Sequence, residues 1–210
     1  MKPLLLFLYL FFGATTYAQT YKFDLIATYT QKVSDKEHSR IVCSNATNDD
    51  YFLTIGTFTS SSTAFVSDFK KQICHTYEIT QSDEDSDKYF IFKYLRTSKI
   101  ESTKAYLNHE YNFEEIESDS LFRNVKLSIY KNTKRKRPVT SQTIVLEKSD
   151  DELFSLYRVA CLHPFEKLDK MKYPGKYKVV SGTGKTSGGY KIKTELLSIK
   201  PINLILNIPH

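Results

Sequence analysis

The chain has 210 residues, of which 40% are hydrophobic and 26% charged, and a formal net charge of +6. This balance is typical of a globular protein and excludes a disordered or fibrous chain, whose composition is far more biased. No segment reaches the roughly 20 apolar residues of a membrane-spanning helix, which excludes that class of membrane protein. The 15 tyrosines and 14 phenylalanines favour β-sheet, because aromatic side chains pack well on pleated surfaces.

The first residues have the pattern of a cleavable secretory signal peptide. Lys2 supplies a positive charge, Leu4–Phe12 is apolar throughout, and the small residue Ala18 suits a signal peptidase. We expect cleavage between Ala18 and Gln19, which removes residues 1–18 and delivers a soluble chain to the periplasm or the medium. No cysteine follows the cut directly, which argues against lipid anchoring as a bacterial lipoprotein.

The first half of the remaining chain is predicted to form short strands joined by polar turns. From residue 21 to residue 29, apolar and polar side chains alternate with the two-residue period of a half-buried strand. The similar runs that follow are 39–44, 51–58, 64–69, 72–80 and 88–97. Strands this close together predict an antiparallel meander rather than βαβ units.

The second half begins with an ambiguous stretch. Residues 101–108 have the pattern of one or two helical turns. Alternation returns over 121–130, and 143–147 is the predicted hairpin partner of that strand, across a basic turn. Near the C-terminus, 176–180 and 189–199 read as another hairpin, and 202–208 as a final strand.

One helix is predicted over residues 150–162. Ser149 and Glu152 have the spacing of a capping box, in which the two side chains satisfy backbone N–H groups at the helix start. An apolar stripe at helical spacing follows, formed by Leu153, Leu156, Tyr157 and Ala160. We therefore expect residues 19–210 to form a single, mainly β (α+β) domain: a curved antiparallel sheet, half-barrel or sandwich, with one packed amphipathic helix.

Three cysteines in an exported chain allow at most one internal disulfide. Cys43 and Cys74 both lie in strand-like runs of the first half, so they are the preferred pair. The alternative is that Cys43, Cys74 and Cys161 are all buried free thiols, since cysteine packs as a small hydrophobic residue.

Positive charge is concentrated in the second half, where residues 106–210 carry 18 basic and 12 acidic side chains. A basic patch on this half would suit an anionic polysaccharide or lipid head groups; the simpler interpretation is a solvated face. The export signal argues against nucleic acid as the partner. The candidate residues are Lys131, Lys134, Arg135, Lys136, Arg137, Lys176, Lys178, Lys191 and Lys193.

Two other segments resemble known binding motifs but lack residues that those motifs require. Residues 181–187 resemble a phosphate-binding loop, but Val179 stands where the motif needs glycine, and a strand follows instead of a helix. They are interpreted as a glycine-rich hairpin loop. Residues 83–94 begin like a calcium loop, but Lys88 and Tyr94 replace its obligatory glycine and glutamate. The five histidines show no metal-ligand spacing, so the motifs predict no metal, cofactor or catalytic residue.

The leading hypothesis for function is a non-enzymatic exported protein that binds an apolar small molecule or lipid inside the curved sheet. The alternatives are a surface module that binds an anionic envelope component, and a hydrolase of envelope polymers whose site assembles only in space. An export signal, a curved antiparallel sheet and one packed helix together resemble the periplasmic lipoprotein-carrier half-barrels. The resemblance is one of architecture and is carried by no motif.

Overall fold

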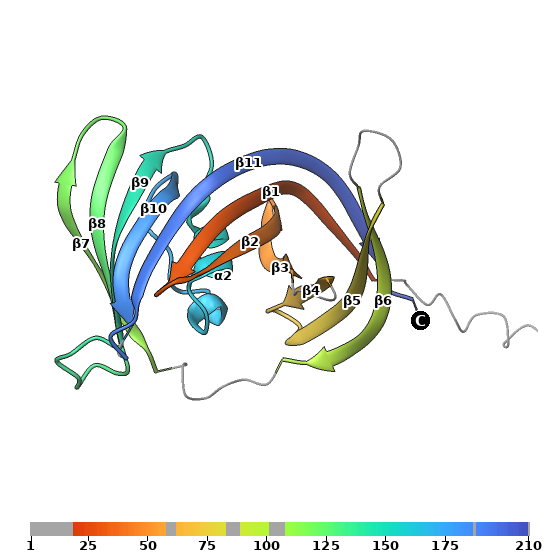
Figure 1. Ribbon diagram of the computed structural model, residues 1–210, viewed down its shortest axis with the longest axis horizontal. Helices are drawn as coiled ribbons and strands as arrows, with labels where there is room; N and C mark the ends of the chain where they lie inside the picture. The colour runs from red at the N-terminus through yellow and green to blue at the C-terminus, as the bar shows by residue number, and fades with distance from the viewer. Residues whose placement is uncertain (1–18, 58–61, 83–88, 101–107, 187, 210) are drawn as a thin grey trace, which may run out of the picture.

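The computed structural model describes residues 19–57, 62–82, 89–100, 108–186 and 188–209. The predicted signal peptide, residues 83–88 of the calcium-loop-like sequence, and all but the last residue of the helical turns predicted over 101–108 lie outside these residues. Eleven described strands form one antiparallel sheet (Figure 1). They are β1 (Thr20–Val33), β2 (Lys36–Asn45), β3 (Asn48–Thr57), β4 (Ser62–Asp68), β5 (Ile73–Ser82), β6 (Tyr89–Lys99), β7 (Glu110–Ser118), β8 (Phe122–Tyr130), β9 (Thr140–Lys148), β10 (Tyr177–Thr186) and β11 (Lys191–Asn207).

The order of the strands is β6-β5-β4-β3-β2-β1-β11-β10-β9-β8-β7. The first and last strands therefore pair at the centre, and each arm of the sheet is a meander of sequence neighbours. At the ends of this central pair, the N–H of Ile208 donates to the carbonyl oxygen of Gln19 at 2.9 Å. The expected curved, mainly antiparallel β fold with one helix is confirmed.

The central strands bend, and the bend has a local cause. The pairing of β1 with β11 shifts register between Phe23 and Leu25, and again between Thr28 and Tyr29. An extra residue at such a β-bulge kinks the strand and increases its twist. β1 and β11 consequently arch over the rest of the molecule in Figure 1.

Several element boundaries differ from the prediction. The strand β7 was not predicted, and β11 is continuous through the two segments predicted as separate strands. The predicted glycine-rich loop is wrong, since residues 181–186 are part of β10. Gly182 is needed inside that strand because a Cβ there would lie 2.8 Å from the hydroxyl oxygen of Tyr157.

The α-helix among the described residues, α2 (Phe154–Cys161), begins four residues later than predicted. The predicted capping box is absent: the Ser149 hydroxyl accepts the N–H of Asp151, and a Glu152 carboxylate oxygen accepts the N–H of Phe154. The amphipathic pattern predicts a polar face exposed to solvent, but seven of the eight helical residues are buried. The chain after the helix, including the short 3-10 helix η1 (Phe165–Lys167), passes over the side that would otherwise face solvent.

Two hydrophobic clusters lie on opposite faces of β2 and β3. Successive side chains of a strand point to opposite faces. Val42 and Phe52 belong to the cluster around α2, while their neighbours Cys43 and Leu53 belong to a second cluster beneath β4 and β5. All four side chains are essentially inaccessible to solvent. The middle of β2 and β3 is therefore buried on both faces, in contrast to the half-buried strands that alternation predicts.

The predicted Cys43–Cys74 disulfide is absent, and all three cysteines are free. Cys43 lies in β2 and Cys74 in β5, with β3 and β4 between them. Three strand spacings amount to roughly 14 Å, about twice the Cα separation that a disulfide tolerates. Burial raises the pKa of the Cys43 thiol to about 12, which keeps it protonated and unreactive.

Candidate functional site

A cavity of about 390 Å³ lies between α2 and the β2–β5 arm of the sheet. Its helical wall is formed by Val159 and Ala160, the latter only half-buried. Opposite them stand Phe65 of β4 and Phe69, which follows that strand. Gly56 contributes backbone instead of a side chain, which leaves room between the aromatic rings and the helix. Thr54 and Ser67 add two hydroxyl groups to the sheet side, so the interior of the cavity is mostly, not wholly, apolar.

The rim of the cavity is charged. Nδ1 of His163 lies 3.0 Å from Oε1 of Glu166, and this hydrogen bond raises the pKa of the imidazole. The positive charge of Arg40, on β2, acts in the opposite direction on the same imidazole. Arg40 itself is exposed and forms no ion pair with any residue that the structure describes. An apolar interior beside an unpaired cation suits an amphipathic molecule with an anionic head.

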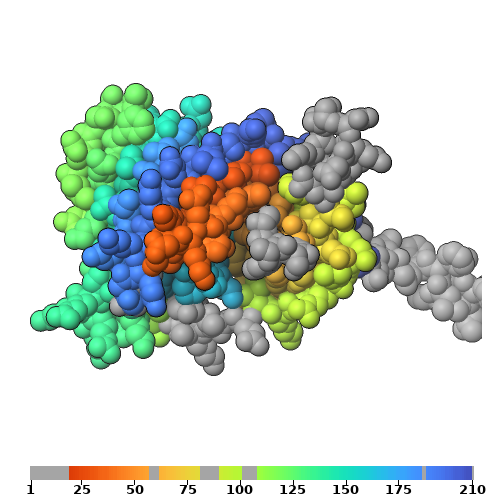
Figure 2. Space-filling model, in the orientation of Figure 1, coloured from red at the N-terminus to blue at the C-terminus, as the bar shows by residue number. Residues whose placement is uncertain are grey.

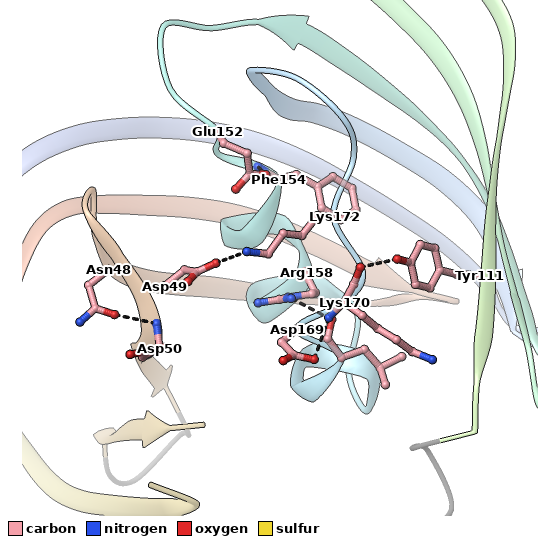
Figure 3. Close-up of polar contacts among 11 residues, drawn as sticks. Asn48, Asp49, Asp50, Tyr111, Glu152, Phe154, Arg158, Asp169, Lys170 and Lys172 are labelled. Carbon is pink, nitrogen blue, oxygen red and sulfur yellow. Dashed lines mark hydrogen bonds and ion pairs between the residues drawn. The ribbon is translucent and has the colours of Figure 1, made fainter. Parts of the chain in front are cut away.

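A buried arginine fixes the helix beside this cavity (Figure 3). Arg158 is 1% exposed, and one of its terminal nitrogens donates to the carbonyl oxygen of Leu168 at 2.8 Å. Burial lowers the pKa of its guanidinium, while the charges of Asp49, Asp169 and Glu152 oppose that effect. Arg158 thus holds the chain after the helix against α2.

Further polar contacts join the same chain segment to both arms of the sheet. Lys172 donates to the carboxylate of Asp49, at the start of β3, at 2.5 Å, and the hydroxyl of Tyr111 in β7 donates to the carbonyl oxygen of Lys170. The Lys172 ammonium lowers the pKa of Asp49. Sequence reasoning missed Arg158, because it falls opposite the apolar stripe and reads as a solvent-facing residue.

A second set of buried polar side chains lies between β1 and β4–β6. The hydroxyl of Tyr21 donates to Oδ2 of Asp68 at 2.9 Å and lies 3.1 Å from Nε2 of His75. The other ring nitrogen of His75 is 2.6 Å from the hydroxyl oxygen of Thr97. Burial raises the pKa of Tyr21 and lowers that of His75. Because both of its ring nitrogens make these contacts, we infer that His75 has a structural role.

The lowered pKa of His75 predicts a dependence of stability on pH. The histidine of an unfolded chain titrates near pH 6.5. Below about that pH, the unfolded chain binds a proton at His75 more tightly than the folded chain does. The free energy of unfolding therefore falls as the pH is lowered. The opposing charge of Asp68 only moderates this effect. We expect the free energy of unfolding to fall less on acidification in His75→Gln than in the wild type, as measured by urea unfolding. The exposed His38→Gln should behave as wild type, and identical losses in His75→Gln and wild type would contradict the assignment.

The predicted basic patch is divided by the fold. Lys191 and Lys193 stand beside Lys32, Lys126 and Lys185, which sequence reasoning did not select. The basic turn 131–137 joins β8 to β9 at the same end of the sheet, because Thr140 pairs with Thr186. Lys176 and Lys178 lie at the opposite end of β10, where Lys178 forms an ion pair with Glu147 at 3.0 Å.

No protein-family model matches the chain, and no curated protein does. Among solved structures, the chain is similar to the crystal structure of a DUF1329 family protein from Desulfovibrio piger. The two share 7% sequence identity over 89% of this chain and 87% of the other, with a TM-score of 0.25. Values this low support no inference about function. Among the described residues, no helix combines the length and the apolar character needed to cross a membrane.

Proposed function

We propose that this protein is a non-enzymatic carrier or receptor for an amphipathic molecule that has an apolar body and an anionic head. The observation that carries the proposal is the cavity of about 390 Å³ between α2 and the β2–β5 arm. Small-molecule sites in proteins are typically apolar hollows of about 300–1,000 Å³ with a few placed polar groups. The predicted signal peptide supports a task outside the cytoplasm.

The apolar part of the ligand would lie between Phe65 and Phe69 on one side and Val159 and Ala160 on the other. Its burial there removes apolar surface from water, which contributes about 25 cal/mol per Å². The head would lie at the rim beside Arg40, whose guanidinium presents several N–H donors to a carboxylate or phosphate. Most of the described residues that bound the cavity belong to packed strands and to α2, which favours a preorganised site.

The test uses a fluorescent long-chain fatty acid and the corresponding fatty alcohol. Ala160→Phe places an aromatic ring in the cavity and is expected to weaken binding of both probes at least tenfold. Arg40→Gln removes the cation and is expected to weaken binding of the acid about tenfold, because a hydrogen bond to a charged group contributes about 1.5–3 kcal/mol. Binding of the alcohol should not change in Arg40→Gln.

Matched controls come from the same part of the chain. Ala46→Phe adds the same ring in the exposed β2–β3 turn, and Lys36→Gln removes a charge from the same hairpin as Arg40. Both should bind both probes as the wild type does. If Ala160→Phe is folded, as judged by circular dichroism, and binds the probes normally, the cavity is not the binding site and the proposal fails.

A further inference from the structure

A second hollow, of about 650 Å³, lies on the opposite face of the sheet, away from α2. Its walls carry the lysine side chains of β1, β8, β10 and β11, and its floor carries the small hydroxyl side chains of Ser141, Thr143 and Thr183. Alternation assigns the face, because Gln31 and Gly182 contact α2 while their neighbours point away from it. We call this hollow the lysine groove and define it by Lys32, Lys126, Lys185, Lys191 and Lys193.

The sheet register places lysines directly opposite one another in the groove. Lys32 is the cross-strand partner of Lys193, and Lys185 is the partner of Lys191. Like charges in such positions destabilise a sheet. Two of the five lysines have a nearby carboxylate: Lys126 lies 3.3 Å from Glu114, and Lys193 lies 3.8 Å from Glu195. The groove therefore concentrates positive charge at a cost in stability to the sheet.

The surroundings of the groove extend the positive surface and add an aromatic residue. Tyr190, directly before Lys191, is 61% exposed at the β10–β11 hairpin. The basic turn 131–137 lies at the same end of the sheet, beside that hairpin. Figure 2 shows the β1–β2, β10–β11 and β8–β9 hairpins next to one another on one side of the molecule. Lysines next to an exposed tyrosine are the combination found at the level of lipid head groups.

We propose that the lysine groove and the adjoining hairpin ends dock this protein on a membrane that contains anionic phospholipids. The lysine ammonium groups and the hydroxyls of the groove floor would bind the phosphates, and Tyr190 would lie among the head groups. A soluble polyanion shares the phosphate or sulfate chemistry, but it offers no layer for the tyrosine ring to enter. The β1–β2 hairpin carries both Lys32, at the groove, and Arg40, at the rim of the cavity on the opposite face of the sheet. The docking itself does not depend on the cavity being occupied.

The test is sedimentation with vesicles of equal parts phosphatidylcholine and phosphatidylglycerol, compared with vesicles of phosphatidylcholine alone. We expect the wild-type chain without its signal peptide to bind only the anionic vesicles, and binding to weaken as salt rises. In the triple variant Lys185→Gln, Lys191→Gln, Lys193→Gln, affinity should fall about a hundredfold, because each lysine near an anionic surface contributes about 1 kcal/mol. Tyr190→Ser should weaken binding further.

The matched control removes three exposed lysines from elsewhere on the sheet and its loops, by Lys148→Gln, Lys176→Gln and Lys200→Gln. An equal loss of vesicle binding in this control would show that only net charge matters, and would overturn the proposal. Tight binding to heparin together with no binding to anionic vesicles would overturn it in favour of a soluble polyanion.

The triple groove variant should have a melting temperature no lower than that of the wild type, because it removes repulsion between lysines. Loss of fold would then not explain a loss of vesicle binding. Fatty-acid binding should survive in it, which separates this proposal from that for the cavity.

Discussion

Replacing Gly184 by alanine is expected to destabilise the protein by about 3 kcal/mol or more, at the upper end of the cost of overpacking. A Cβ at this position would lie 2.3 Å from the backbone carbonyl oxygen of Ser141 and 2.8 Å from Cα of Gln142. Both atoms belong to the backbone of β9, so no side-chain rotation relieves the clash. The sheet would have to open between β9 and β10. Urea unfolding followed by circular dichroism measures the loss.

Gly182→Ala, two residues away, provides the comparison. Its Cβ would meet the hydroxyl oxygen of Tyr157 at 2.8 Å, and that hydroxyl donates to Oε1 of Gln142 at 2.5 Å. A side chain yields more easily than backbone, so the destabilisation should be smaller than in Gly184→Ala. Adding Tyr157→Phe should restore part of the stability of Gly182→Ala and none of that of Gly184→Ala. A Gly184→Ala protein as stable as the wild type would show that β9 and β10 are not packed this closely.

Removal of the buried arginine is the second change with a large expected effect. Arg158→Ala should cost about 2–5 kcal/mol, the range for truncating a long buried side chain to alanine. The carbonyl oxygen of Leu168 would lose its donor, and Asp49, Asp169 and Glu152 would lose the cation between them. The measurement is again the free energy of unfolding in urea.

Arg158→Met separates charge from packing. Methionine fills much of the volume of the arginine stem, so this variant should be less destabilised than Arg158→Ala while still leaving the Leu168 carbonyl unpaired. Lys70→Met removes an exposed cation, 3.1 Å from Asp50, near the same cluster and should leave stability unchanged. Proteolysis of the chain between Leu162 and Tyr173 should accelerate in both arginine variants. Wild-type stability in Arg158→Ala would rule out the role proposed for this side chain.

The strands were largely predictable because alternation and turn residues are local signals. The prediction for residues 121–130 matches β8 within one residue at its start, and its hairpin with β9 is present. The pairing of β1 with β11 is not encoded locally, since it joins segments almost the whole chain apart. The burial of Val42 and Cys43 on opposite faces of β2 could not be predicted for the same reason. It depends on which distant elements pack against each face.

The candidate sites were only partly visible in the sequence. Lys191 and Lys193 were recognised as a pair on one strand face, but Lys32 joins them only through the β1–β11 register. The cavity had no sequence signal, since Phe65 and Ala160 become neighbours only when α2 packs against the sheet. Each of these residues is unremarkable alone, and only the tertiary fold makes it part of a site.

The pairing of the first and last strands also sets the order in which the molecule is completed. Each meander arm has mainly local contacts and is able to begin forming as soon as its own hairpins exist. The centre must wait for β11, which follows the other described strands in the chain, and contacts between distant segments slow folding. Until then, β1 and β10 each expose an unpaired edge, which is a template for association between chains. A chain interrupted before β11 would therefore be two separate half-sheets that are prone to aggregate, so the last strand acts as the closing piece of the whole fold.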